Sequence, residues 1–304
     1  MPEGSGKHMR PAPDARPAQA SGSQAMGMLP VAAMEGVRAS GKKPRKGGKG
    51  RRSRIVANVL IVVGILLLLA AAGLWGFSQW RYHEQDVINQ KLARYAEVTD
   101  RASDAPQVDW EGLKAVNKDV IGWLYIPGTN VNYPVYQGAD NDQYLRHSAE
   151  GEWTIAGQLF MDYENRAPGL VDNQSIIYGH HMQNGTMFQQ IAALDDQENF
   201  DKISTIWYVT EQGSYELEPL LLYYTNPEDT NVRQFSFGTQ DEFHSYLSGL
   251  LSKAVTKRSD ASQVIAGTDH VLTMSTCNYY DGYGRTIFVC VPKAEASAAS
   301  AQSS

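Results

Sequence analysis

A cysteine and an arginine near the end of the chain stand at a spacing that suits cysteine-based chemistry. An apolar run leads into Cys277, a loop with the turn signal Asp281-Gly282 follows, and residues 286–291 have the composition of a returning strand. If the two strands pair as an antiparallel hairpin, Cys277 and Arg285 lie opposite each other, with Cβ atoms roughly 5 Å apart. A guanidinium beside a thiol lowers the pKa of that thiol and can stabilise a developing oxyanion.

A nucleophilic thiol also needs a side chain that accepts and donates protons. His180 and His181 supply two candidates at the end of another predicted strand, directly after Tyr178-Gly179. Successive strand residues face opposite ways, so only one of these histidines can meet Cys277. The same alternation separates the two imidazoles, and no Cys or acidic cluster completes a ligand set, so the pattern does not favour a metal site. The residues predict a cysteine enzyme.

The second cysteine, Cys290, offers an alternative reading of Cys277. Extracellular chains often pair their cysteines, which would make Cys277–Cys290 a disulfide. Cys277 opens the loop, however, whereas Cys290 lies five residues into the returning strand, a poor register for a cross-strand bridge. We therefore expect Cys290 to pack as a small apolar residue of the core.

The overall charge of −6 conceals two opposite segments. Residues 1–54 carry twelve Lys and Arg against three acids, and the rest of the chain carries fifteen basic and thirty acidic residues. Residues 1–54 are also rich in Gly, Pro, Ser and Ala, a composition that buries too little apolar surface to fold. This segment is predicted to be disordered. Its basic cluster adjoins an apolar run and accompanies no folded nucleic-acid reader, so nucleic-acid binding is not expected.

Residues 55–77 form a stretch of 23 residues without a charge. At about 1.5 Å per residue, such a helix spans the roughly 30 Å hydrocarbon layer of a bilayer. The basic cluster before it predicts a single-pass cell-membrane protein with a cytoplasmic N-terminus and an extracellular domain. A cleavable signal peptide is the alternative, because residues 70–73 have small side chains typical of a cleavage site. The apolar run continues beyond that point, which favours an uncleaved anchor.

The remainder divides into a juxtamembrane helix and linker at 78–109, a folded domain at 110–293 and a frayed, disordered tail at 294–304. Within the folded domain, short β-rich runs alternate with Gly, Asn, Asp and Pro turns. These runs cover residues 120–126, 131–136, 158–161, 174–178, 205–210, 215–224, 270–276 and 286–291. About eight such strands predict a mostly β fold, a closed or nearly closed barrel. A capping box at residues 239–242 begins a predicted helix that extends to residue 254, and residues 187–194 suggest a shorter one.

As a set, these segments resemble the sortases, and among them class B. The segments that carry the resemblance are 119–129 (DVIGWLYIPGT), 133–135 (YPV), 140–145, 157–162 (GQLFMD), 178–182 (YGHHM), 185–188 (GTMF), 275–277 (STC) and Arg285. The resemblance implies an eight-stranded β-barrel preceded by a membrane anchor. It also implies that His180, which directly follows the glycine, is the catalytic histidine, together with Cys277 and Arg285. Class B members often have an Asp after the cysteine; here Asn278 follows, with Asp281 as a possible stand-in.

The resemblance further implies a reaction that needs no cofactor, together with its partners. Cys277 attacks a C-terminal sorting signal of a surface-protein precursor, of the Asn-Pro-x-Thr type, and forms a thioester. An amine of a cell-wall peptidoglycan precursor of the lipid II type then takes the acyl group. In this interpretation His180 is an imidazolium that favours the thiolate and protonates the leaving amine. Three alternatives remain open: a pilin-polymerising sortase that uses a Lys amine, a secreted cysteine protease, and a tethered barrel that only binds peptides.

Overall fold

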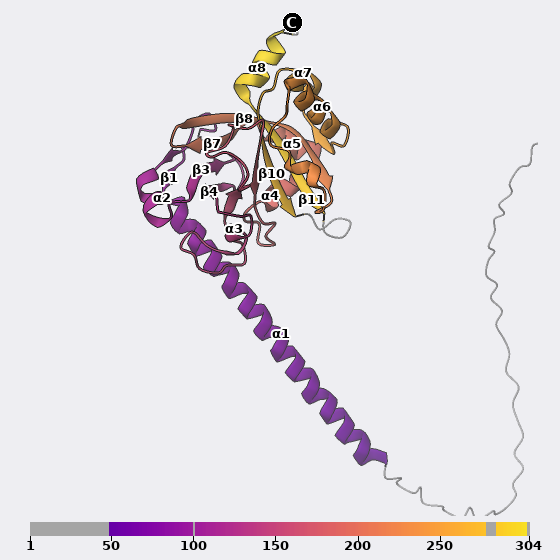
Figure 1. Ribbon diagram of the computed structural model, residues 1–304. Coiled ribbons are helices and arrows are strands. Elements are labelled where there is room, and N and C mark those ends of the chain that lie inside the picture. Colours follow the sequence, from indigo (N-terminus) through magenta and orange to yellow (C-terminus); the bar gives the residue numbers. More distant parts are fainter. Residues whose placement is uncertain (1–48, 100, 278–283, 303–304) are drawn as a thin grey trace, which may run out of the picture. The chain divides into compact units, whose positions relative to one another are not determined.

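The computed structural model describes residues 49–99, 101–277 and 284–302, with the side chains of Lys49, Arg51, Cys277 and residues 300–302 outside the description. The chain divides into two compact units, residues 1–61 and 62–304. The second unit contains the strands and the shorter helices (Figure 1).

The apolar stretch belongs to one long helix, α1 (Lys49–Ala93). The part from Arg52 is long and apolar enough to cross a membrane by length and composition. The helix includes residues 49–54, which were predicted to be disordered, and it continues without a break into the predicted juxtamembrane helix. Leu92 near its C-terminal end is buried against the folded domain.

Within the described residues, eight strands close a barrel. Their order is β11-β10-β6-β5-β4-β3-β7-β8, and pairing of β8 with β11 completes the ring, while the short β9 extends from β8. The strands are β3 (Val120–Tyr125), β4 (Asn132–Tyr136), β5 (Leu159–Met161), β6 (Gln174–Tyr178), β7 (Ile206–Thr210), β8 (Gly213–Thr225), β9 (Thr256–Lys257), β10 (Val271–Cys277) and β11 (Arg285–Pro292). The eight predicted β-rich runs correspond to the eight barrel strands. The barrel prediction is confirmed.

Two faces of these strands are buried, which explains their high content of β-branched and aromatic residues. The interior contains Leu124, Phe288 and Cys290, each fully buried. On the outside, Ile287 and Val289 of the same β11 pack beneath the helices of the C-terminal half. Alternate residues of β11 therefore belong to different cores, and a slip of one residue would exchange them.

Helix α6 (Gln240–Leu251) covers one outer face of the barrel with Phe243, Leu247 and Leu250 buried. The Thr239 side chain accepts a hydrogen bond from the amide of Glu242 at 3.2 Å, as the capping box predicts. The helix ends three residues before the predicted end.

The C-terminal residues are helical rather than frayed. Helix α8 (Lys293–Gln302) buries Ala296 and Ala299, and the Glu295 carboxylate accepts hydrogen bonds from the Asp269 and His270 amides at 2.7 and 3.0 Å. The prediction of a disordered tail is wrong here because alanine, the best helix former, can also pack closely on a neighbouring helix, in this case α7 (Ala261–Ala266).

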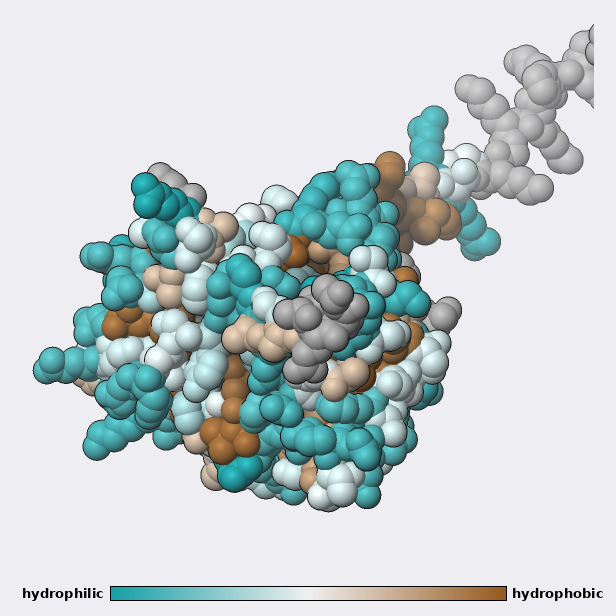
Figure 2. Space-filling model, turned by 90° about the horizontal axis from the view of Figure 1, so that it is seen from above, coloured by the Kyte–Doolittle hydropathy of each residue, from teal (hydrophilic) through white to brown (hydrophobic). Residues whose placement is uncertain are grey.

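The remaining elements are short. They are β1 (Ala96–Glu97), β2 (Gln107–Val108), α2 (Trp110–Val116), α3 (Gln143–Arg146), α4 (Gln189–Ala192), η1 (Ala193–Asp195), α5 (Gln197–Lys202) and η2 (Thr230–Arg233). On the face seen from above, hydrophilic side chains predominate and apolar ones form small separate patches (Figure 2).

We expect Phe288→Ala to lower the free energy of unfolding by about 3–5 kcal/mol. Phe288 is fully buried inside the barrel and meets Phe200 edge-on, with ring centroids 6.0 Å apart, so truncation leaves a cavity. Chemical unfolding of the full chain in detergent micelles measures the change. The exposed Val255→Ala should change it by less than about 0.5 kcal/mol. Equal losses in both variants would contradict this packing.

Candidate functional site

Strand pairing brings distant segments to one end of the barrel. β10 runs parallel to β6, with Ser275 beside Tyr178, and antiparallel to β11, with Cys277 directly paired with Arg285. On the far side of β11, Arg285 pairs with Thr225 at the end of β8. The predicted hairpin register is therefore present in the backbone. The side chain of Cys277, and the whole of Asn278 and Asp281, lie outside the described residues.

A tight loop after β6 fixes His180. Gly179 continues the ladder, since its amide donates to the Ser275 carbonyl at 3.1 Å, and the His180 carbonyl accepts from the Phe188 amide at 2.9 Å. A Cβ atom on Gly179 would lie 2.5 Å from Leu159 and 2.6 Å from Phe188, so only glycine allows this close approach. The loop backbone is thus held from both sides before the histidine side chain makes any contact.

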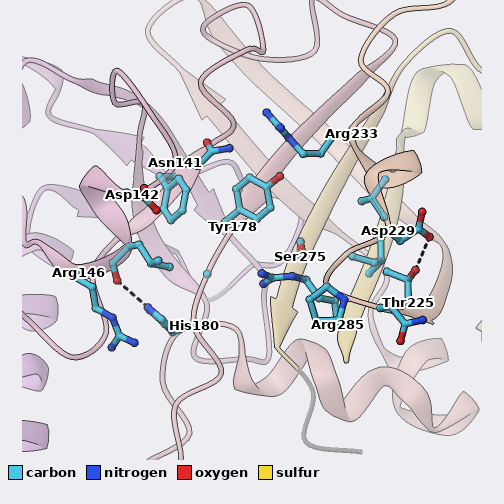
Figure 3. Close-up of a pocket in the computed structure, with 17 residues that line it drawn as sticks. Asn141, Asp142, Arg146, Tyr178, His180, Thr225, Asp229, Arg233, Ser275 and Arg285 are labelled. Carbon is cyan, nitrogen blue, oxygen red and sulfur yellow. Dashed lines mark hydrogen bonds between the residues drawn. The ribbon is translucent and has the colours of Figure 1, made fainter. Parts of the chain in front are cut away.

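The imidazole of His180 is oriented by a backbone carbonyl. Its Nε2 lies 2.8 Å from the Leu145 carbonyl oxygen of α3 (Figure 3). A carbonyl only accepts, so Nε2 carries a hydrogen and, in the neutral ring, Nδ1 has the free lone pair. Nδ1 is therefore the nitrogen able to take up a proton.

Burial lowers the pKa of His180, and the nearby Arg146 and Arg285 guanidiniums lower it further, although the Leu145 carbonyl favours the charged ring. The neutral imidazole is thus the favoured resting form near pH 7. This differs from the imidazolium expected from the sequence, because sequence spacing revealed neither the burial of the ring nor the charge of Arg146. Figure 3 shows the two arginines on opposite sides of the ring.

His180 and His181 differ in the cavities that they line. A cavity of about 430 Å³, here called the main cavity, is lined by His180 and Arg285 but not by His181. His181 lines a second cavity and forms an isolated bridge with Met187. Both histidines line the second cavity, but only His180 also shares the main cavity with Arg285.

The wall of the main cavity contains residues to which the sequence assigned no role. They are Asn141, Asp142, Leu145, Arg146, Phe160, Tyr178, Thr225, Asn226, Pro227, Asp229, Val232, Arg233 and Ser275. The Ser275 hydroxyl is buried without a hydrogen-bond partner among the described residues. Such a group can donate to a peptide carbonyl that enters the cavity. Among the described residues, no group of three or more His, Cys, Asp or Glu is placed to hold a metal ion.

A buried carboxylate supports that wall. Asp162 has a fully buried side chain that accepts two hydrogen bonds from the Arg233 guanidinium, at 2.8 and 2.9 Å. Tyr178 and Asn141 donate to the same carboxylate at 2.8 and 3.1 Å. Burial by itself would raise the pKa of Asp162, but the hydrogen bonds from Arg233, the Glu164 amide and Tyr178 outweigh it and lower the pKa. One carboxylate thus ties together three residues of the cavity wall.

Cys290 is a different kind of thiol. It is free and fully buried in the barrel interior, and desolvation raises its pKa well above the ordinary value. Such a thiol is unreactive. The prediction that Cys290 packs as a small core residue is confirmed.

Comparison with known proteins identifies the family. The sortase domain model matches residues 124–293, more than half of the chain. The chain belongs to the sortase family. Sortase B of Listeria monocytogenes is 29% identical over 231 residues, which cover 73% of this chain and 92% of that protein. Sortase B of Staphylococcus aureus is 33% identical over 177 residues, covering 58% and 70%.

The fold also agrees with that of class B sortases. The structure of a Staphylococcus aureus sortase B–substrate complex matches with a TM-score of 0.59 and 25% identity, over 70% of this chain and 97% of that one. Sortases are cysteine transpeptidases that act on sorting signals, and this chain is a sortase with the barrel fold of class B. Sortases are also membrane-associated, and α1 could serve as the anchor.

In this sortase, Arg233→Leu should lower the free energy of unfolding by about 1–3 kcal/mol near pH 7. Arg233 is partly exposed, whereas the Asp162 side chain it leaves behind is buried. The folded-state pKa of Asp162 lies below the unfolded value of roughly 3.9. The stabilisation is therefore present above that pH and is lost as the pH falls through the folded pKa.

Unfolding titrations at pH 7 and at pH 3 or below test this expectation. The difference in the free energy of unfolding between wild type and Arg233→Leu should be smaller in acid than at pH 7. The exposed Arg94→Leu should have nearly the free energy of unfolding of the wild type at either pH. If Arg233→Leu lowers the free energy of unfolding equally at both pH values, Arg233 does not act by stabilising the charge of Asp162.

Arg146→Gln should raise the pKa of His180. The positive charge of Arg146 disfavours the imidazolium, so its removal makes protonation easier and moves the titration to higher pH. NMR titration of the imidazole signals measures this shift, with Arg94→Gln as the control of equal charge change. A pKa that stays constant or falls in Arg146→Gln would contradict the electrostatic account of this site.

Proposed function

We propose that Cys277, His180 and Arg285 form the catalytic centre, and that the donor is an Asn-Pro-x-Thr-type sorting signal bound in the main cavity. The observation that carries the proposal is the β10–β11 register, which pairs Cys277 with Arg285 at the barrel end where His180 leaves β6. His180 and Arg285 line one cavity, and the cavity is large enough for several side chains of an extended peptide.

The first half-reaction forms a thioester. The Cys277 sulfur attacks the carbonyl carbon of the signal's threonine while the neutral His180 takes the thiol proton at Nδ1. The Leu145 carbonyl accepts from Nε2–H and so stabilises the imidazolium that forms. His180 then returns the proton to the departing amine, and the C–N bond breaks. Arg285 cannot give up its proton, so its role is to hold the developing oxyanion and the peptide backbone.

The second half-reaction transfers the acyl group. An amine of a cell-wall precursor attacks the thioester, His180 removes the proton of that amine, and the Cys277 thiol is released. A lipid II-type acceptor suits a catalytic domain held at the membrane by α1. In this arrangement the basic residues before α1 lie in the cytoplasm and the barrel lies outside.

The test measures whether an amine or water resolves the thioester. The full chain in detergent micelles is incubated with an Asn-Pro-x-Thr peptide and increasing concentrations of an oligoglycine amine. We expect the amide product to increase at the expense of the hydrolysed peptide, since both arise from one thioester. Mass spectrometry quantifies both products.

Matched variants locate the nucleophile. Cys277→Ala should abolish both products, whereas Cys290→Ala should retain them because Cys290 is buried and unreactive. Hydrolysis that is unaffected by the amine would support a cysteine protease instead, and activity in Cys277→Ala would exclude the mechanism.

A further inference from the structure

A second cavity adjoins the main cavity at His180. It has a volume of about 350 Å³ and is formed between α1 and the loop after β6, with Phe77 and Arg81 on one side and His181 on the other. His180 and Arg146 line both cavities. A molecule in the second cavity would therefore approach the catalytic histidine from the side away from Arg285.

Two guanidiniums, those of Arg81 and Arg146, line the second cavity and are charged at any working pH. Arg81, Arg146, His180 and His181 contribute to its wall, and none of the described lining residues is acidic. The acidic side chains Glu84, Glu150 and Glu152 line the neighbouring cavity, which Arg81 also borders. An anion is thus favoured in the second cavity and disfavoured in its neighbour.

Arg81 is held in place but its charge is not neutralised by an ion pair within the described residues. Its guanidinium lies 4.3 Å from the centre of the Trp153 ring and 5.7 Å from that of Phe77. Its Nη2 is shielded from solvent and has no hydrogen-bond partner among the described residues. A buried donor without a partner is costly, and an anion on this guanidinium would offset part of that cost.

The cavity is next to the point where the apolar stretch ends. Phe77 is the last residue of the uncharged stretch 55–77, and Arg81 follows one helical turn later, about 6 Å along the axis. If residues 55–77 fill the hydrocarbon layer, Arg81 lies at the depth of the lipid headgroups. Phosphate groups are the anions found at that depth, and the planar guanidinium binds phosphate through two parallel hydrogen bonds.

We propose that this cavity binds the diphosphate of a lipid-linked acceptor and so directs the acceptor amine to His180. The inference rests on the proposed function, because it assigns a location to the acceptor of that reaction. The donor signal then occupies the main cavity and the acceptor enters from the second one, so the two substrates meet at His180 without competing for one cavity. Arg81 acts in this scheme as a binding residue for the acceptor, and Trp153 positions its guanidinium.

The direct test is binding of inorganic pyrophosphate to the full chain in dodecyl maltoside micelles, which contain no phosphate. Isothermal titration calorimetry should show binding by the wild type, weakened about tenfold or more in Arg81→Gln. Arg94→Gln removes the same charge just beyond the end of α1, outside the cavity, and should bind within about twofold of the wild type. No binding by the wild type, or equal binding by Arg81→Gln, would overturn the proposal.

A second variant and a lipid bilayer test the same cavity. Arg146→Gln should also weaken binding, and thermal unfolding of each variant shows whether a loss reflects misfolding. Repeating the titration in nanodiscs that contain phosphatidylglycerol distinguishes the source of the phosphate. Weaker pyrophosphate binding by the wild type there means that bilayer headgroups fill the cavity, whereas unchanged binding favours the diphosphate of a carrier lipid.

Failure of this inference is separable from failure of the proposed function. Thioester formation with the donor peptide is followed in the same preparations and needs no acceptor. A wild type that forms the thioester but does not bind pyrophosphate contradicts the acceptor site alone. A wild type that binds pyrophosphate but forms no thioester contradicts the catalytic proposal alone.

Discussion

The register of β10 between β6 and β11 is the constraint on which the site depends. It pairs Ser275 with Tyr178 on one side and Cys277 with Arg285 on the other. A slip of one residue would exchange the interior and exterior faces of the strand, which are both packed, so the register is strongly fixed. The same packing that stabilises the barrel therefore sets the backbone positions of the residues proposed to be catalytic.

Electrostatics around His180 determine how those residues can work. The ring is partly buried, two guanidiniums flank it, and the neutral form is favoured. A neutral imidazole can act as a base toward a thiol, whereas a standing imidazolium could not. The Leu145 carbonyl selects the tautomer and supports the charge only when the proton arrives. The arrangement suits transient rather than permanent protonation of His180.

The sequence was sufficient to predict the strands and the hairpin because both leave local signals. Alternating β-branched residues, the turn signal in the sequence Asp281-Gly282 and the capping box at Thr239 are each local features of the sequence. The contacts that hold the site residues in place leave no such local signal in the sequence. The carbonyl of Leu145 has no residue-type signature, and the pairing of Asp162 with Arg233 joins segments from different strands and loops.

Long-range contacts also explain two predictions that were wrong, one for the C-terminal residues and one for the charge of His180. The helicity of α8 depends on packing of Ala296 and Ala299 and on Glu295 near His270, none of which composition reveals. The charge environment of His180 was misjudged for the same reason, since Arg146 approaches it only after α3 has folded against the barrel.

The central claim, that Cys277 is the nucleophile at this barrel end, is tested most directly by locating the covalent intermediate. The full chain is mixed with a sorting-signal peptide, quenched in acid and digested, and the acyl adduct is mapped by mass spectrometry. The account predicts the adduct on the peptide that contains Cys277, with Cys290 unmodified. An adduct on Cys290, or turnover with no thioester on either cysteine, would contradict it.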